Sequence, residues 1–490
     1  MSHSPGIEEL LISDTKSLKE ALEIIDANAQ GTCFVIDASG KLAGVITDGD
    51  IRRALLEGKT LEVNVREVME TEFTALPVTT HVDKVQEKIS STIKIIPLVD
   101  ENNVPVDYAS RTRAYRIPVM TPQLNGNELK YVTECITTGW ISSQGAFVKQ
   151  FEKTFGEYVG VPNAVAVSNG TVAIHLALEA LGIGPGDEVI VPDLTFAASI
   201  NAVIYTGATP VLADIDPETW TLSPESVRSL ITTKTKAIMP VHLYGHPCHM
   251  DELMAIAKEK KLLVVEDCAE ALGTLYKGRH VGTFGHAATF SFFGNKTITT
   301  GEGGMTLFND PAVFEKAVVL RDHGMSKQKR YWHEYVGFNY RITNVQAAIG
   351  CAQLERLDEF VKAKRNMAAV YNEGLKKLDC ITLPPETSWA FNGYWLYTCI
   401  VDPSAGVSRD ELIAKLMKNG VETRPVFYPL HAMPPYLEYV KTGQTFPVSD
   451  SISQNGISLP SSVTITKEEQ QTILNAVTGI YNTRKLNVAR

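Results

Sequence analysis

A lysine and a group of carboxylates follow predicted strands closely enough to share a reaction centre. The strand-like segment LLVVED ends in Glu266 and Asp267, and Glu270 comes three residues later. Lys296 follows the apolar segment ATFSFF. A buried carboxylate can hold a proton on a pyridine-type nitrogen, and a desolvated lysine is a nucleophile that forms Schiff bases. Taken alone, a helix N-cap explains Asp267 and a solvated surface group explains Lys296.

A glycine-containing turn offers a place for an anion. The strand AVAVS leads through SNGT into the helical segment VAIHLALEAL, so Gly170 and Thr171 are predicted at a helix N-terminus. Backbone amides and the helix dipole favour phosphate there, although an ordinary N-cap explains the same residues. The order of a phosphate cradle, a strand-end Asp and a strand-end Lys resembles that of aspartate-aminotransferase-like pyridoxal enzymes.

Alternating strands and helices must position these residues. Over residues 114–375, strands such as EVIVP and TPVLADI alternate with helical segments, which predicts an α/β fold with a doubly wound, mostly parallel sheet. Sites in such sheets lie at the carboxyl ends of strands. The amphipathic stretch from Asn344 to Leu378 leads into a smaller α+β domain, which we assign to residues 376–490.

The first 113 residues form a separate predicted domain with an internal repeat. FVIDASGKLAGVITDGDIRR, from Phe34 to Arg53, is echoed by PLVDENNVPVDYASRTR, from Pro97 to Arg113. Each copy is predicted as an amphipathic helix followed by two short strands around a polar turn. The proline-containing stretch at 115–126 is typical of a linker, so we place the domain boundary between residues 113 and 114.

Ordered motifs extend over residues 116–485. They are SNGTVAIHLAL, PDLTFAAS, VEDCAEALG, SFFGNKTITTGEGGM, RYWHEYVGFNYRITNVQAAIG and RPVFYPLH. Together they resemble the DegT/DnrJ/StrS sugar aminotransferases, which implies the aspartate-aminotransferase fold (fold type I) with a seven-stranded sheet and pyridoxal 5'-phosphate as cofactor. Within that family, EDCAEA, SFFGNKTIT and RYWH most resemble the subgroup that forms GDP-perosamine. The implied reaction moves an amino group from glutamate to the C4 ketone of GDP-4-keto-6-deoxymannose, for surface polysaccharide such as O-antigen.

The resemblance also implies roles for single residues at the cofactor. Lys296 would bond to the cofactor and move protons, and Asp267 would pair with the pyridine nitrogen. Many relatives have His or Gln near the cofactor hydroxyl where this chain has Glu270, a departure that agrees with the perosamine-forming subgroup. The other implied cofactor contacts are Phe196 at the ring, Gly170, Thr171 and Ser291 at the phosphate, and Asn339.

Asn339 matches a residue that reaches the partner subunit's phosphate, so the resemblance implies a homodimer with shared active sites. The implied nucleotide-sugar contacts are Arg341, Arg424, Tyr428 and His431. Three alternatives stay open. They are the same chemistry on a UDP- or dTDP-linked keto sugar, a pyridoxal-dependent sugar dehydratase, and a nucleotide-sensing regulator with an inert pyridoxal half. Dehydratases of this family have His in place of the lysine, so Lys296 favours amino transfer.

The segment GVITDGDIRR carries a threonine and, three residues on, an aspartate: Thr47 and Asp50. This resembles the CBS-domain signature that contacts an adenine nucleotide, so the repeat resembles a pair of CBS domains. The second copy, PVDYASR, has no equivalent aspartate, and we therefore expect one working site at most. A pair used only for dimerisation or docking is the alternative.

Composition limits the remaining possibilities. Forty-six basic against 56 acidic residues give a net charge of −10, which argues against nucleic acid and anionic membranes as partners. Seven scattered cysteines and an acidic N-terminus predict a cytoplasmic protein with reduced thiols, and we expect no membrane helix. The segment HPCH, at 246–249, matches no usual zinc spacing, so we predict no metal site.

Overall fold

The structure is a computed structural model that describes residues 6–78, 80, 82–90, 93–110 and 117–488. It divides into two compact units, Met1–Pro118 with Lys415–Glu422, and Val119–Ala414 with Thr423–Arg490. The boundary predicted at residues 113 and 114 lies outside the described residues, and the one predicted at 375 and 376 stays a prediction. None of the helices in the described part of the chain combines the length and apolar character that a membrane span needs.

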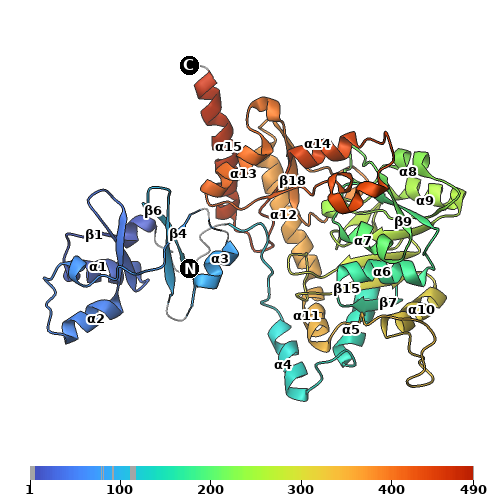
Figure 1. Ribbon diagram of the computed structural model, residues 1–490, viewed down its shortest axis with the longest axis horizontal. Coiled ribbons are helices and arrows are strands. Elements are labelled where there is room, and N and C mark those ends of the chain that lie inside the picture. Colours follow the sequence, from blue (N-terminus) through green and yellow to red (C-terminus); the bar gives the residue numbers. More distant parts are fainter. Residues whose placement is uncertain (1–5, 79, 81, 91–92, 111–116, 489–490) are drawn as a thin grey trace. The chain divides into compact units, whose positions relative to one another are not determined.

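The first unit repeats one strand and helix pattern (Figure 1). In each copy a first strand pairs in parallel with a second, which pairs antiparallel with a third. The register is displaced by 63 residues, because Phe34 faces Val45 in one copy and Pro97 faces Tyr108 in the other. The elements are β1 (Leu11–Ser13), α1 (Leu18–Asn28), β2 (Thr32–Ile36), β3 (Leu42–Thr47) and α2 (Asp48–Leu56), then β4 (Leu76–Pro77), α3 (Val82–Lys88), β5 (Ile95–Val99) and β6 (Pro105–Ser110).

The same polar turn joins the last two strands of each copy. Asp37 accepts hydrogen bonds from the backbone N–H groups of Ser39 and Lys41, and Asp100 accepts them from Asn102 and Val104. An aspartate that bonds the backbone ahead of it stabilises a tight turn. The repeat seen in the sequence is therefore a repeat of the fold.

The second unit contains a seven-stranded sheet in the order β7-β15-β14-β11-β10-β8-β9. Only β15 runs antiparallel to its neighbours, so the predicted mostly parallel sheet is confirmed. Its strands are β7 (Ala164–Val167), β8 (Glu188–Pro192), β9 (Thr209–Ala213), β10 (Thr235–Ile238), β11 (Leu263–Asp267), β14 (Ala287–Ser291) and β15 (Gly304–Phe308).

Helices cover both faces of this sheet, and alternate residues of one strand enter different cores. Ala164 and Ala166 of β7 belong to one apolar cluster, whereas Val165 and Val167 belong to another. This two-sided burial is why the strands are apolar along their whole length. The helices are α4 (Glu128–Thr138), α5 (Ala146–Val159), α6 (Gly170–Ala180), α7 (Ala198–Tyr205), α8 (Pro224–Leu230), α9 (Met250–Lys260) and α10 (Pro311–Arg321).

The amphipathic stretch predicted after residue 344 forms two helices, α11 (Asn344–Leu354) and α12 (Leu357–Leu375). They lead to a four-stranded sheet in the order β16-β18-β20-β19 and its helices. A three-stranded sheet, β13-β12-β17, completes the unit. The elements are β12 (Leu275–Tyr276), β13 (Arg279–His280), β16 (Ile381–Thr382), β17 (Ala390–Phe391), β18 (Tyr397–Val401), α13 (Arg409–Lys418), β19 (Arg424–Pro425), α14 (Pro447–Asn455), β20 (Gly456–Leu459) and α15 (Lys467–Val488).

Candidate active site

The ends of three strands bring the predicted cofactor residues together. In the sheet, Ser291 of β14 pairs with Gly304 of β15, which pairs with Val167 at the end of β7. On the other side β14 pairs with β11, which ends at Asp267. A parallel sheet presents its carboxyl ends at one edge, and that edge is where ligands bind in this fold class.

The proposed phosphate cradle lies where β7 turns into α6. The helix begins at Gly170, and the side chain of Asn169 caps it by accepting a hydrogen bond from the backbone of Val172. A Cβ atom on Gly170 would lie 2.8 Å from the Cβ of Ser291, so only glycine lets this backbone approach the serine hydroxyl. The helix N-terminus and a hydroxyl thus converge, as an anion site requires.

Asp267 is buried and held by two donors. Its Oδ2 accepts a hydrogen bond of 2.8 Å from the Ser199 hydroxyl, and its Oδ1 accepts one of 3.1 Å from the backbone of Ala269. Burial raises the pKa of the Asp267 carboxyl, while these two donors and Lys296 act in the opposite direction. A cationic partner in this pocket would be bound strongly, since it would complete a charge pair away from water.

Lys296 lies in the turn after β14, close to Glu270. Its Nζ is 3.5 Å from Glu270 Oε1, and only 12% of the lysine side chain is exposed. Burial lowers the pKa of Lys296, whereas Glu270 and Asp267 favour its charged form and Arg424 disfavours it. A lysine whose pKa is lowered carries a free electron pair more often at neutral pH, which is what a nucleophile and proton carrier needs.

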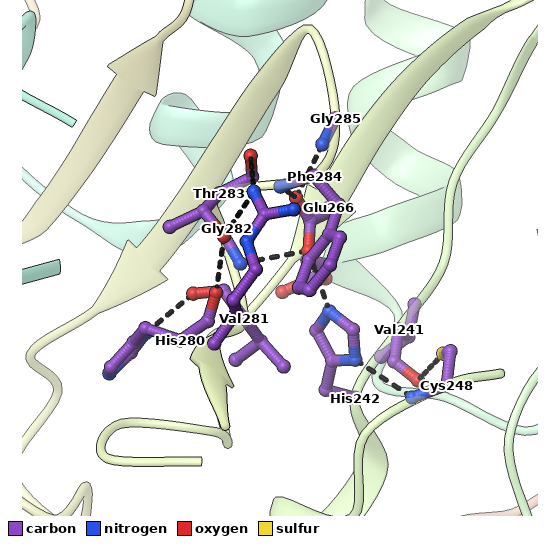
Figure 2. A network of polar contacts seen from close by, with 12 residues as sticks. Val241, His242, Cys248, Glu266, His280, Val281, Gly282, Thr283, Phe284 and Gly285 are labelled. Carbon is purple, nitrogen blue, oxygen red and sulfur yellow. Dashed lines mark hydrogen bonds and ion pairs between the residues drawn. The ribbon is translucent and has the colours of Figure 1, made fainter. Parts of the chain in front are cut away.

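The carboxylate beside Asp267 has a different environment (Figure 2). Glu266 accepts hydrogen bonds from the backbone N–H groups of Gly282, Phe284 and Gly285, at 2.6–2.8 Å. Its Oε2 also lies 3.2 Å from His242 Nε2. Successive strand residues point to opposite faces, so neighbouring carboxylates reach different surroundings. Glu266 therefore anchors the 282–285 loop, and of these two neighbouring carboxylates only Asp267 faces the site.

His242, Glu266 and Cys268 lie close enough together to suggest a metal centre, with their ligand atoms within 4.8 Å of one another. The contacts favour a hydrogen-bond network instead. His242 Nδ1 accepts a bond from the backbone of Cys248 while its Nε2 faces Glu266, so neither ring nitrogen offers a lone pair to a metal.

Asn339 and Arg341 form a second group. The Arg341 guanidinium donates to Asn339 Oδ1 at 3.2 Å and lies 2.8 Å from an oxygen of Asp322. The backbone of Arg341 is bridged to Val167 at the end of β7. These contacts place the segment beside the strand that leads to the cradle, and they give Arg341 a carboxylate partner within its own chain.

The other sugar-site residues differ in exposure. Tyr428 is 61% exposed, and Arg424 at β19 is exposed as well, so both are available to a ligand. His431 is held more firmly, because its Nδ1 lies 2.7 Å from Asp193 and its Nε2 lies 3.4 Å from Asp450. A sugar contact for His431 stays a prediction, and it would compete with these two carboxylates.

Phe196 is 60% exposed, which leaves its face open for a flat ring. The structure adds three residues that the sequence did not single out: Ser199 on Asp267, Tyr244 on Glu270, and Trp395, whose ring centroid is 3.7 Å from Lys296 Nζ. Ser199 follows Phe196 by one helical turn, a spacing that predicts a shared face. No comparable signal marks Tyr244 or Trp395.

Comparison with known proteins agrees with this geometry. Residues 122–478 match the DegT/DnrJ/EryC1/StrS aminotransferase family. The chain belongs to this family. It is 47% identical to a GDP-perosamine synthase from Escherichia coli O157:H7 over 75% of this chain and 99% of that protein. It is 48% identical to a GDP-perosamine synthase from Caulobacter vibrioides over 74% of this chain and 97% of that protein.

A solved structure of a family member extends the likeness to the fold. The putative sugar aminotransferase Spr1654 from Streptococcus pneumoniae, in its PMP form, is 28% identical with a TM-score of 0.71, covering 77% of this chain and all of that one. The predicted fold type is thus confirmed. Residues 7–57 match the CBS domain, which covers the first copy of the N-terminal repeat.

The residues present fit the pyridoxal phosphate of this aminotransferase family. Gly170 and Ser291 converge at a helix N-terminus, and Asp267 is a buried carboxylate with two donors, to which no guanidinium or ammonium of the described residues is hydrogen-bonded. Lys296 lies in reach of the same pocket. A phosphate, a ring nitrogen and an aldehyde would each meet a matching group.

Proposed function

We propose that this protein is a GDP-perosamine synthase, which transfers an amino group from glutamate to the C4 ketone of GDP-4-keto-6-deoxymannose. The observation that carries the proposal is the sequence identity of 47–48% to two GDP-perosamine synthases, which the match covers over 97–99% of their length. The retained pair of Asp267 and Lys296 supports amino transfer, and the product would serve surface polysaccharide such as O-antigen.

Pyridoxal phosphate, when bound, supplies a carbonyl carbon that takes up the amino group and a ring that withdraws electrons. Asp267 would keep a proton on the ring nitrogen, because its buried carboxylate gains from a charged partner. Lys296 Nζ would remove a proton from the substrate carbon and return it, as a general base and then a general acid. Gly170, Thr171 and Ser291 would hold the phosphate, and Phe196 would stack on the ring.

Product analysis on several nucleotide sugars tests the substrate. With glutamate as donor, GDP-4-keto-6-deoxymannose should be aminated at least about tenfold faster than the UDP- and dTDP-linked 4-keto-6-deoxy sugars, which corresponds to 1.4 kcal/mol of discrimination. Faster amination of a UDP or dTDP sugar would overturn the choice of nucleotide. Loss of the sugar hydroxyl without uptake of nitrogen would identify a dehydratase.

We further propose a homodimer in the cytoplasm. All seven cysteines lie within the described residues and none forms a disulfide, which suits a reducing compartment. Asn339 would reach the partner subunit's cofactor phosphate, so each site would need both chains. Mixing inactive Lys296→Ala subunits with Asn339→Ala subunits should restore activity, because one site of the mixed dimer has both residues intact. No recovery after verified subunit exchange would contradict a shared site.

The CBS match supports an adenine-nucleotide site in the N-terminal unit, at Thr47 and Asp50. In the structure these residues form a capping box, in which the Thr47 hydroxyl donates to Asp50 Oδ2 at 2.7 Å and the Asp50 N–H donates to the hydroxyl. Binding of a nucleotide would replace these hydrogen bonds between Thr47 and Asp50 with hydrogen bonds to the nucleotide. Calorimetric titration with AMP, ADP and ATP should show binding that Asp50→Ala weakens about tenfold or more and that Asp48→Asn leaves unchanged. Absence of heat with all three would leave the capping box as the role of the motif.

A further inference from the structure

The catalytic amine has an aromatic neighbour as close as its carboxylate. Lys296 Nζ lies 3.7 Å from the centroid of the Trp395 ring and 3.5 Å from Glu270 Oε1. An ammonium over the face of an indole is attracted by the ring's negative face, and the attraction is strongest where water is excluded. Trp395 is 4% exposed, so its face is dry.

Trp395 is fixed at both its ring and its backbone. The indole Nε1 donates a hydrogen bond of 2.8 Å to the carbonyl of Asn295, the residue next to Lys296. Its own carbonyl accepts a bond of 2.9 Å from Lys364. The indole is thus hydrogen-bonded to the turn that carries the lysine. This bond fixes the position of the ring relative to Nζ.

The ring also begins a row of aromatic side chains that leads to the predicted cofactor contact. Trp395 stacks on Tyr244 at 6.0 Å between centroids, Tyr244 stacks on Phe427 at 5.5 Å, and Phe427 lies 5.8 Å from Phe196. Such pairs contribute beyond the burial of their surface. The row therefore joins the neighbour of Lys296 to the exposed ring of Phe196.

Tyr244 connects this row to the other neighbour of Lys296. Its backbone N–H donates to Glu270 Oε2 at 2.9 Å, and its φ of 52° lies in the left-handed region that a tyrosine adopts at a cost. Packing between Trp395 and Phe427 holds it there. One strained residue thus positions both the carboxylate and the aromatic face.

From these contacts we propose that Trp395 is a further catalytic residue, whose indole face holds the Lys296 ammonium whenever that nitrogen is not bonded to the cofactor. The inference rests on the proposed role of Lys296. Together with Glu270 and Asp267 it gives the amine three neighbours that favour its charged form, whereas burial and Arg424 disfavour that form. The lysine is thereby kept able to take up and give back a proton without leaving the site.

The test measures Lys296 in full-length protein from which the cofactor has been removed. The rate of amine-selective labelling of Lys296, followed by peptide mass spectrometry over a pH series, reports its pKa directly. Trp395→Leu should move this profile to lower pH by about half a unit to one and a half units, because an aliphatic side chain offers the ammonium no negative face. Trp395→Phe should move it in the same direction by less.

Trp389→Leu is the matched control, since Trp389 packs on Tyr276 and His249 and makes no contact with the lysine among the described ring and cation contacts. Its profile should equal that of the wild type. An unchanged or raised pKa of Lys296 in both Trp395 variants would overturn the proposal. If Trp395→Leu does not fold, the result for Trp395→Phe decides the test. Uptake of pyridoxal phosphate by the wild type, measured in parallel, separates this failure from failure of the proposed function.

Discussion

Two lysines in the second unit, one fully buried and one 12% exposed, show how the partners of an amine determine its role. Lys296 lies near the carboxylates of Glu270 and Asp267, so a proton can leave it and return to it within a charged cluster. Lys364 on α12 is fully buried, and its Nζ donates to the backbone carbonyls of Trp395 and Ser461 at 2.9 and 2.8 Å. Burial lowers the pKa of Lys364 to about 7.

The different partners of the two lysines distinguish a reactive amine from a structural one. Burial lowers both pKa values, but carbonyl groups keep only the donors of Lys364 satisfied, whereas carboxylates stabilise the positive charge of Lys296. Lys364 thereby fixes the segment that carries Trp395, and Lys296 remains available for chemistry. A lowered pKa by itself would not have told the two lysines apart.

The largest expected effect is that of Lys296→Ala. Removing the proposed nucleophile and proton carrier should lower the rate of amino transfer by about a thousandfold or more, with unchanged circular dichroism. The rate is measured as glutamate-dependent formation of the amino sugar. Activity within tenfold of the wild type would mean that another group performs the proton transfer, and the contrast with Lys364 would fail.

Lys364→Met should change how stability depends on pH. Between pH 7 and about 10.5 the unfolded chain keeps a proton on Lys364 that the folded protein has released. The free energy of unfolding of the wild type therefore rises with pH in this window. Lys364 contributes up to about 1.4 kcal/mol per pH unit to this rise. Below pH 7 the lysine is protonated in both states and adds no slope.

The methionine variant lacks this contribution. We compare the free energies of unfolding of the variant and the wild type by urea denaturation at each pH. The variant's value should drop further below that of the wild type as the pH rises from 7. A constant difference between the two proteins over the whole window would show that Lys364 is charged in the folded state up to its usual pKa.

Glu270→Gln tests the effect of the carboxylate on Lys296. Without the carboxylate the charged amine loses a stabilising neighbour, so the pKa of Lys296 should fall further, by about one unit. The labelling profile of Lys296 reads this shift. Glu266→Gln is the control, because Glu266 bonds the 282–285 loop and His242, and an equal shift there would show that the effect is not local.

Lys316→Met should have the smallest effect. Lys316 also donates to two backbone carbonyls, those of Glu179 and Ala180 at the end of α6, but it is only half-buried. We expect a loss of stability below about 1 kcal/mol in urea denaturation, as for a cation at a helix C-terminus. A loss that grows from pH 7 upward, as expected for Lys364→Met, would show that burial does not distinguish the two.

The sequence predicted the sheet because apolar strands leave a local signal, and it placed the proposed cofactor residues at the ends of those strands. Apolar strands ending in polar residues revealed β11 with Asp267 and β14 with the turn to Lys296, and the 63-residue repeat proved to be a repeat of the fold. The separate tasks of Glu266 and Asp267 were not predictable, since they depend on which loop packs on each face of the strand.

Tyr244 and Trp395 could not be predicted for the same reason. They approach Lys296 and Glu270 from segments about 50 residues before and 100 residues after the lysine, and neither follows a motif of chemistry-bearing residues. For Thr47 and Asp50 the sequence signal was present but had two explanations. Their spacing predicted a ligand site, and the structure shows that the same spacing also forms a capping box.

The most direct test of the whole account is the absorbance spectrum of the purified, pyridoxal-phosphate-loaded protein before and after addition of glutamate, with Lys296→Ala alongside. Glutamate should convert the spectrum from the pyridoxal to the pyridoxamine form with release of one 2-oxoglutarate per site. GDP-4-keto-6-deoxymannose should reverse the change, and the variant should do neither. A wild-type protein that takes up no cofactor, or whose spectrum glutamate leaves unchanged, would contradict the account.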